Sequence, residues 1–287
     1  MRILIVDAPG AHPESYSRVL GSALHRLGHS AIVHPAKDAT GAWPFRHKFR
    51  RHAREVLAVH QPDIVHVISR EPWVAEAFVG RGVPVVHSSE GKVSRSEWVV
   101  VPTRAALNVA AGSGQDLDVQ VGRLPYAMEL GTSPETYGGF VRVFAPRGDA
   151  RAARWVREAG RLAPFVPLRD DGDPREVRAV LSVASDPGAW PRGVVEAMAA
   201  GRPVVTGWSG PAQEFVLEGV TGFLSAPGDV PSLASHLAFL WDHPEQALHM
   251  GAEAAERAKA EFAPAAHAKM LVRWYLRAGV SRLALSS

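Results

Sequence analysis

Glu196 has the best-defined chemical setting of any side chain in this sequence. It stands in a short apolar helix predicted at 194–200, directly after a loop rich in proline and glycine. Gly201 ends that helix, because glycine adopts the left-handed backbone that follows a helix, and a strand is predicted at 203–206. In an open parallel sheet, the N-terminus of such a helix points to the carboxyl edge of the strands and favours an anion. A carboxylate there can accept hydrogen bonds from two vicinal hydroxyl groups; the alternative is a solvated glutamate that stabilises the first helical turn.

A basic segment from Trp43 to His60 is a second candidate site. Read as a helix, it aligns an apolar stripe, formed by Phe45, Phe49, Ala53, Val56 and Leu57. The remaining faces carry cations, namely Arg46, Lys48, Arg50, Arg51 and Arg54. This pattern is typical of a helix that contacts anionic lipid, or that captures an anionic acceptor. The alternative is a domain helix whose stripe packs on a sheet and whose basic face is solvated.

Strands and helices alternate along the whole chain, which predicts an α/β fold. Strands are expected at 2–7, 31–34, 62–68, 83–87, 97–102, 118–124, 140–144, 165–168, 181–184 and 203–206. Helices are expected at 15–27, 43–60, 104–111, 150–159, 174–180, 194–200, 230–241, 244–262 and 264–278. Residues 130–140 show no periodicity and are rich in glycine and proline, which is typical of an interdomain linker.

The composition limits the class of protein. A chain of 287 residues suits two domains better than one core. With 46% hydrophobic and 21% charged residues, it is typical of a globular protein, and no run approaches the roughly 20 apolar residues of a membrane span. The strand at 2–7 is too short for a signal peptide, so secretion is not expected. The absence of cysteine excludes disulfides and thiolate chemistry, and a net charge of +3 gives no argument for nucleic acid.

Four stretches of the second half carry a resemblance to a known family. They are E-A-M-A-A-G-R-P-V-V-T from Glu196, G-P-A-Q-E from Gly210, E-G-V-T-G-F-L from Glu218, and Pro227-Gly228-Asp229. In this order and spacing the chain resembles the family 4 (group 1) retaining glycosyltransferases of the GT-B fold, which use nucleotide sugars.

The resemblance implies a GT-B architecture, in which two Rossmann-like α/β domains face each other across a cleft. The acceptor-side domain is expected at 1–130, with the C-terminal helix 264–287 packed back on it, and the donor domain at 138–263. The implied reaction is transfer of a sugar from a nucleotide-diphosphate sugar to an acceptor with retention. The nucleotide sugar is a co-substrate, no cofactor or metal is implied, and a cytoplasmic location is expected.

The resemblance also assigns residues to the donor. Glu196 would hold the ribose hydroxyls, and amides of the loop before its helix would contact the diphosphate. Arg192 offers a bidentate guanidinium where Pro191 has lost a backbone donor. The other predicted donor-binding residues are Arg147, Arg151, Trp190, Gly193, Val194 and Gly210. Arg192 and Arg147 would stabilise the charge on the leaving phosphate; the alternative for Arg147 and Arg151 is an ordinary place on the surface of an arginine-rich chain.

The first half is expected to supply the acceptor side of the site. Gly10 and His12 lie in the loop after the first strand, where the family has a glycine-rich loop. Glu90 falls at the position of a family histidine, and would orient a sugar hydroxyl or act as a base. His87 would reach the site by rotation, although a histidine at a strand end is more often structural. A strong base is not required in this chemistry, because the leaving diphosphate helps to deprotonate the acceptor.

The sequence departs from the family pattern in the catalytic region. The first of two family glutamates falls at Gly188, and the usual lysine-glycine pair after Arg147 is absent. The alternative function is therefore a catalytically impaired GT-B module that binds a nucleotide or glycan, or partners an active glycosyltransferase. A sugar-nucleotide epimerase or a glycan phosphorylase ranks last, because neither Lys259 nor Lys269 lies in a recognisable pyridoxal-phosphate motif.

The expected partners follow from these assignments. They are a nucleotide sugar, a glycan, lipid or small-molecule acceptor, and, through 43–60, the inner face of an anionic membrane. Nucleic acid is not expected. No metal site is predicted, because the one acidic cluster, Asp170-Asp171-Gly172-Asp173, is expected to be a loop that ends in a helix cap.

Overall fold

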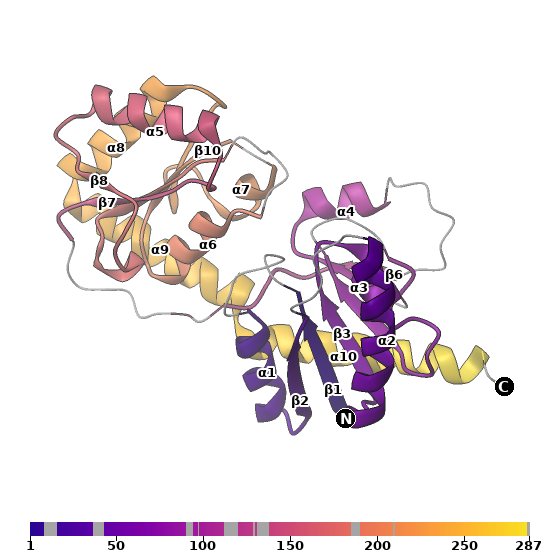
Figure 1. Ribbon diagram of the computed structural model, residues 1–287. Helices are drawn as coiled ribbons and strands as arrows, with labels where there is room; N and C mark the ends of the chain where they lie inside the picture. Colours follow the sequence, from indigo (N-terminus) through magenta and orange to yellow (C-terminus); the bar gives the residue numbers. More distant parts are fainter. Residues whose placement is uncertain are drawn as a thin grey trace. The chain divides into compact units, whose positions relative to one another are not determined.

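The computed structural model describes residues 1–8, 16–36, 43–89, 94–96, 98–111, 120–128, 130, 138–184, 190–208 and 210–285. It confirms the α/β class, with two parallel sheets that are each covered by helices (Figure 1). The chain forms two compact units. Unit 1 comprises Met1–Met128 and Phe262–Ser287, and unit 2 comprises Glu129–Glu261.

Unit 1 contains a six-stranded sheet in the order β2-β1-β3-β4-β5-β6, and all its strands are parallel. The strands are β1 (Arg2–Asp7), β2 (Ser30–Pro35), β3 (Ile64–Ile68), β4 (Val85–Ser88), β5 (Trp98–Val101) and β6 (Gln120–Arg123). The helices are α1 (Tyr16–Arg26), α2 (Trp43–His60), α3 (Pro72–Glu76), α4 (Arg104–Ala111) and α10 (Pro264–Leu285). The central strands β3 and β4 are buried along their whole length, as expected for parallel strands that are covered on both faces.

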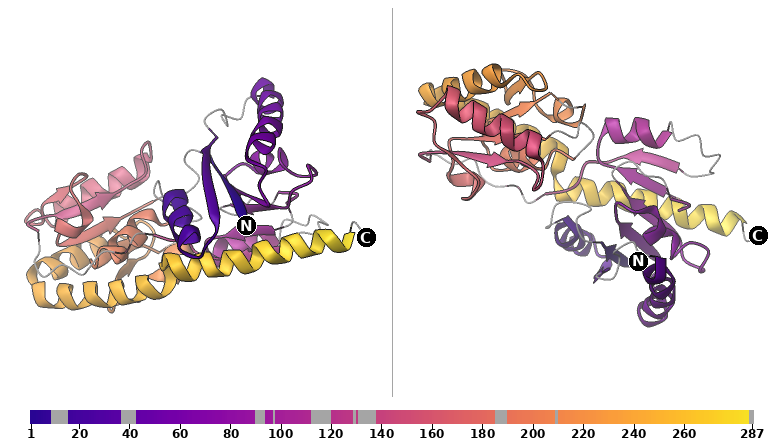
Figure 2. Two further views of the ribbon diagram at one scale, coloured as in Figure 1. Left: turned by 90° about the horizontal axis from the view of Figure 1, so that it is seen from below. Right: turned by 45° about the horizontal axis from the view of Figure 1, so that its top comes forward.

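Helix α10 packs on α1 and β4 of unit 1, and Figure 2 shows it running along that unit. The ring of Trp274 stacks on Trp98 of β5, with 5.3 Å between centroids and 10° between planes. A Cβ atom added to Gly122 of β6 would lie 2.9 Å from the Trp274 ring, so only glycine allows this approach. The last helix in the sequence therefore completes the core formed by the first half.

Helix α2 follows the prediction for its apolar stripe. Phe49, Ala53 and Val56 are buried against the core of unit 1, where Phe49 meets Trp73 and Phe78 edge-on. The domain-helix interpretation is thus correct for these three residues, which are not available for insertion into lipid. The cations at 46, 48, 50, 51 and 54 remain exposed. In the described part of the chain, no helix is long and apolar enough to cross a membrane.

Unit 2 contains a five-stranded parallel sheet in the order β11-β10-β9-β7-β8. The strands are β7 (Val141–Phe144), β8 (Leu168–Arg169), β9 (Ala179–Ser182), β10 (Val204–Gly207) and β11 (Gly222–Ser225). The helices are α5 (Ala150–Leu162), α6 (Arg192–Ala199), α7 (Gly210–Phe215), α8 (Val230–Asp242) and α9 (Pro244–Phe262). The chain passes from β7 to β8 on one side of β7, and then crosses to β9 on its other side. The topological switch point therefore lies between β7 and β9.

One predicted element of unit 2 is wrong. The helix expected at 174–180 is a single 3-10 turn at Pro174–Glu176, capped by the side chain of Asp173, and the chain is extended again at Val177. Strand β9 then begins at Ala179, earlier than expected, because it pairs with β7 on one side and β10 on the other. Sheet pairing therefore overrides the local helical pattern. Strand β8 begins at Leu168, where the strand expected at 165–168 was to end, and α5 extends beyond its predicted end to Leu162. The short helices α3 and α7 and the strand β11 were not predicted.

Candidate functional site

The carboxyl edge of the unit 2 sheet is the candidate functional site. Strands β7 and β9 flank the switch point and end at Phe144 and Ser182. In open α/β sheets, the connections after two such strands run in opposite directions, and ligands bind in the crevice between the loops that follow them. The loop after β7 contains Arg147, and the loop after β9 leads into α6.

Gly193, in the first turn of α6, brings this helix onto the switch point. A Cβ atom at this position would lie 2.6 Å from Cβ of Phe144 and 2.6 Å from Oγ of Ser182. Carbon and oxygen atoms do not approach so closely, so only glycine permits this packing. The first turn of α6 therefore lies directly against the ends of both flanking strands.

The N-terminus of α6 offers hydrogen-bond donors at this edge. The Arg192 N–H donates to the carbonyl of Trp190 at 2.8 Å, and the Val195 N–H donates to that of Pro191 at 3.1 Å. The amides of Gly193 and Val194 have no acceptor within the described part of the chain, and no side chain caps the helix. Two free N–H groups and the positive end of the helix dipole form a site that favours an anion.

Arg192 and Glu196 form an ion pair on the same helix, one turn apart. Nε of Arg192 lies 2.5 Å from Oε1 of Glu196. The Glu196 side chain is 18% exposed and that of Arg192 is 48% exposed. The structure thus brings together the two residues that the sequence assigned to ribose and phosphate, and the pair presents an acceptor and a donor side by side.

Arg147 and Arg151 also lie at this edge. Arg147 is exposed in the loop after β7, and Arg151 is exposed in the first turn of α5. Asp149 caps α5 by accepting a hydrogen bond from the Ala152 N–H at 2.9 Å. Within the described residues, neither arginine forms an ion pair, so both guanidinium groups are available to an anionic ligand.

Two tryptophans at this edge have different roles. Trp190 is buried and packs edge-on against Phe215 of α7, at 5.6 Å between centroids, so it anchors the loop before α6. Trp208 follows β10, is 53% exposed, and donates its backbone N–H to the Ser225 carbonyl at 2.6 Å. The prediction did not include Trp208; an aromatic residue in a loop after a strand was the available signal. Gly210 begins α7, and contributes no side chain.

His87 of unit 1 has a structural role. It is fully buried, its Nε2 donates to the carbonyl of Ser69 at 3.0 Å, and its Nδ1 lies 2.9 Å from Oγ of Ser94. Burial lowers the pKa of His87 to about 4, so it is neutral near pH 7. Rotation towards a ligand would break both hydrogen bonds, so the geometry supports the structural interpretation. Glu90, Gly10, His12 and Gly188 lie outside the described residues.

The acidic cluster at 170–173 forms local ion pairs. Asp171 pairs with Arg169 at 2.9 Å, and Asp173 pairs with Arg175 at 2.6 Å. The hydrogen bonds from Arg175 lower the pKa of Asp173 to about 2. Across the described ranges, no group of three or more histidine, aspartate or glutamate side chains could hold a metal ion.

The same part of the chain is similar to a known protein family. Residues 178–257 match the family model described as glycosyl transferases, group 1. That segment contains α6, the Arg192–Glu196 pair and the strands β9 to β11. Over this segment the chain is therefore similar to the group 1 glycosyltransferases, which confirms the predicted resemblance. No curated protein matches the sequence.

Three solved structures are similar over nearly the whole chain. Anabaena Alr3699/HepE in complex with UDP is 17% identical, with a TM-score of 0.65 over 95% of this chain and 99% of that one. A glycosyltransferase from Rickettsia africae ESF-5 is 14% identical, with a TM-score of 0.75 over 96% and 98%. The sucrose-phosphate synthase tll1590 from Thermosynechococcus elongatus is 15% identical, with a TM-score of 0.71 over 100% of both chains. These similarities confirm the GT-B fold.

Proposed function

We propose that this protein transfers a sugar from a nucleotide-diphosphate sugar to an acceptor hydroxyl, with retention of the anomeric configuration. The observation that carries the proposal is the position of the α6 N-terminus, which Gly193 packs against the strand ends at the switch point. The group 1 domain and the UDP complex of Alr3699/HepE support a nucleotide sugar as the donor.

Each group at the edge has a role in this reaction. The free amides of Gly193 and Val194 bind diphosphate oxygens, together with the guanidinium groups of Arg192 and Arg147. Glu196 accepts hydrogen bonds from the ribose hydroxyls. As the bond from the anomeric carbon to the diphosphate breaks, the cations stabilise the charge that develops on the leaving oxygen. The acceptor hydroxyl bonds to the anomeric carbon and gives its proton to the departing phosphate.

A thermal-shift panel of UDP-, GDP-, ADP- and dTDP-sugars identifies the donor, and variants test the site. We expect Glu196→Ala to weaken binding of the best ligand by about tenfold or more, since a hydrogen bond to a charged group is worth about 1.5–3 kcal/mol. The matched control is Glu158→Ala on α5, because Glu158 pairs with Arg154 at the same spacing and at 2.8 Å. Equal effects of the two variants, or no binding by any nucleotide, would contradict the proposed site.

The alternative function is a GT-B module that binds the nucleotide without turnover. Gly188, at the position of a family glutamate, favours this reading. Incubation of the best ligand with candidate acceptors, followed by NMR of the anomeric proton, separates the two functions. A product with the configuration of the donor supports retaining transfer, whereas binding without any product or hydrolysis supports the module.

We further propose that the enzyme acts in the cytoplasm and contacts anionic membranes through the exposed cations of α2. Phe49, Ala53 and Val56 of α2 are buried, so the proposed attraction is electrostatic and should decrease as salt screens it. Arg81 adds to this field, because its guanidinium lies against α2 and donates to the Arg50 carbonyl at 3.3 Å.

Vesicle flotation tests this contact. Anionic vesicles should bind the protein at low salt, and both zwitterionic vesicles and high salt should abolish binding. The double variant Lys48→Glu/Arg54→Glu should lose binding, whereas Arg157→Glu/Arg161→Glu, which changes the net charge equally on exposed residues of α5, should retain it. Similar losses for both double variants would show that only net charge matters and would reject α2 as the contact surface.

A further inference from the structure

His34 and His52 form a close pair on the surface of unit 1. His34 lies on β2, the edge strand of its sheet, and His52 lies on α2. Their Nε2 atoms are 3.0 Å apart, and their rings are 5.2 Å apart at the centroids. We propose that this pair binds one divalent first-row transition-metal ion. The site is in a different unit from the proposed donor site and does not depend on it.

The spacing of the two nitrogens suits one shared ion. A metal bound by histidine lies about 2.05 Å from each nitrogen, so a 3.0 Å separation corresponds to an N–metal–N angle of about 94°. That angle fits neighbouring positions of an octahedral or square-planar ion, which Ni²⁺ and Cu²⁺ prefer. A tetrahedral ion such as Zn²⁺ needs a separation of about 3.3 Å. Nitrogen ligands bind Ni²⁺ and Cu²⁺ most tightly among the divalent first-row ions, so copper and nickel are the expected metals.

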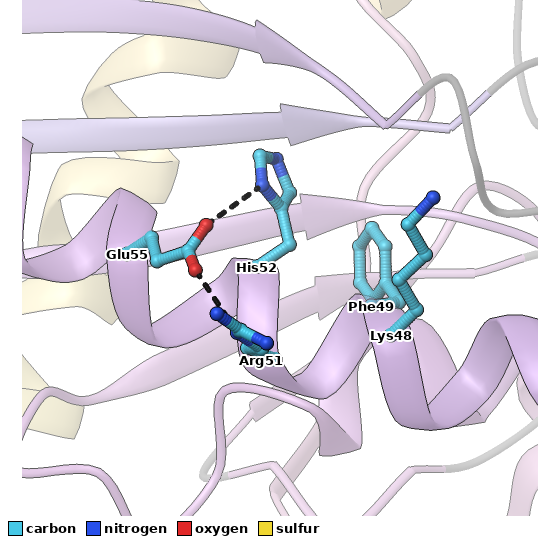
Figure 3. Close-up of a pocket in the computed structure, with 5 residues that line it drawn as sticks. All are labelled: Lys48, Phe49, Arg51, His52 and Glu55. Carbon is cyan, nitrogen blue, oxygen red and sulfur yellow. Dashed lines mark ion pairs between the residues drawn. The ribbon is translucent and has the colours of Figure 1, made fainter.

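The surroundings orient His52 for this role. A carboxylate oxygen of Glu55 lies 3.9 Å from Nδ1 of His52, and its other oxygen lies 3.4 Å from Arg51 (Figure 3). At 3.9 Å this contact is too long for a hydrogen bond, but it places a carboxylate on the Nδ1 side of the ring and leaves Nε2 for a metal. Here the free nitrogen is Nε2, which faces His34.

The elements below the pair hold it in place. Helix α2 is packed on the core through Phe49, and β2 is hydrogen-bonded to β1 along its length. Both histidines therefore lie in regular secondary structure, and no loop has to close to bring their nitrogens within 3.0 Å. Without metal, the two imidazoles can share only one N–H···N hydrogen bond, which the ion replaces with two bonds.

The remaining coordination positions are left to water. A surface pocket of about 240 Å³ lies beside His52 and is lined by Lys48, Phe49, Arg51, His52 and Glu55 (Figure 3). The ring of His60 is 6.1 Å from that of His34, edge-on, and so belongs to the outer surroundings of the pair. The expected stoichiometry is one ion per chain.

Calorimetric titration of the tag-free, full-length protein with NiCl₂, CuCl₂ or ZnCl₂ tests the site. We expect one equivalent of Cu²⁺ or Ni²⁺ to bind, and we expect His34→Ala and His52→Ala each to weaken binding at least tenfold. The matched control is His47→Ala, an exposed histidine of the same helix, which should bind like the wild type. Glu55→Gln should weaken binding less than loss of either ligand. The electron paramagnetic resonance spectrum of the Cu²⁺ complex should show coupling to two imidazole nitrogens.

Three results would overturn the proposal. They are no binding of any of the three ions, wild-type binding by His34→Ala or His52→Ala, and an equal loss in His47→Ala. Tighter binding of Zn²⁺ than of both other ions would overturn the right-angle geometry. Because nucleotide binding is measured separately in the thermal-shift panel, failure of the metal site and failure of the donor site are distinguishable.

Discussion

The two units share a strand order but use their polar residues in opposite ways. In both sheets the first strand lies between the second and the third, so each has a switch point in the same place. Unit 1 buries its polar groups: the Tyr275 hydroxyl lies 2.5 Å from Nδ1 of His66, and Tyr16 lies 2.8 Å from Nε2 of His267. Unit 2 instead exposes Arg147, Arg151 and Arg192 at the carboxyl edge of its sheet.

The buried histidines and tyrosines of unit 1 therefore serve packing, whereas exposed arginines of unit 2 are available to a ligand. The buried network of unit 1 joins α10 to the sheet, because His267 and Tyr275 both belong to α10. Burial raises the pKa of Tyr16 and Tyr275, so both remain neutral hydroxyls. A buried polar network stabilises a fold only when its members are all present, so unit 1 should depend strongly on its last helix.

The largest expected effect comes from removing the anchor of α10. Trp274→Ala deletes a buried ring that stacks on Trp98 and fills the space at Gly122, so it should lower the free energy of unfolding by about 3–5 kcal/mol. Urea denaturation measures this loss. Leu276→Ala is the control on the same helix, because Leu276 is 53% exposed and should change stability by less than about 0.5 kcal/mol. Similar losses in both variants would show that the core of unit 1 does not depend on Trp274.

Acid should destabilise unit 1 before unit 2. Burial lowers the pKa of His87 to about 4 and that of His267 to about 3, against a value of about 6.5 in the unfolded chain. Between pH 6.5 and about 3 the unfolded chain therefore binds more protons at these two histidines, so their contribution to stability falls as the pH falls through this window and levels off below it. For His87 alone the loss is on the order of 3 kcal/mol.

Hydrogen exchange near pH 7 and near pH 5 measures this difference between the units. Amides of β3 and β4 should lose protection at the lower pH, after correction for intrinsic exchange rates, whereas those of β9 and β10 should lose less. The variant His87→Gln should show a flatter dependence on pH than the wild type. Equal loss of protection in both sheets would contradict the assignment of acid sensitivity to unit 1.

A smaller effect on stability, but a direct effect on binding, is expected from Gly193→Ala. The added methyl group would meet Phe144 and Ser182, which costs about 1–3 kcal/mol and moves the α6 amides away from the switch point. Nucleotide affinity should fall by at least about tenfold, which corresponds to 1.4 kcal/mol. Gly139→Ala is the control, because a Cβ atom there meets nothing within 4 Å. Unchanged affinity in Gly193→Ala would show that the close approach of α6 does not position the nucleotide.

The sequence predicted much of this fold because the signals are local. Buried parallel strands appear as short runs of Val, Ile and Leu, and Gly201 does adopt the left-handed backbone, with φ of +67°, that marks the end of α6. Strand β9 was misplaced because pairing with β7 and β10 is not visible in the sequence of one segment. The Arg192–Glu196 pair follows from helical spacing. The packing of Gly193, in the same helix, against Phe144 and Ser182 does not, because Phe144 is almost fifty positions away in the sequence.

By itself, the sequence determined the α/β class, most of the long helices and strands, and the group 1 motifs, since these depend on periodicity and on residues close together in the chain. Only the tertiary structure decided which polar residues face solvent. It buried His87 and Phe49, left Arg147 and Trp208 exposed, and brought Nε2 of His34 within 3.0 Å of Nε2 of His52. The physical reason is that burial and close approach depend on how separate elements pack, and no single segment contains that information.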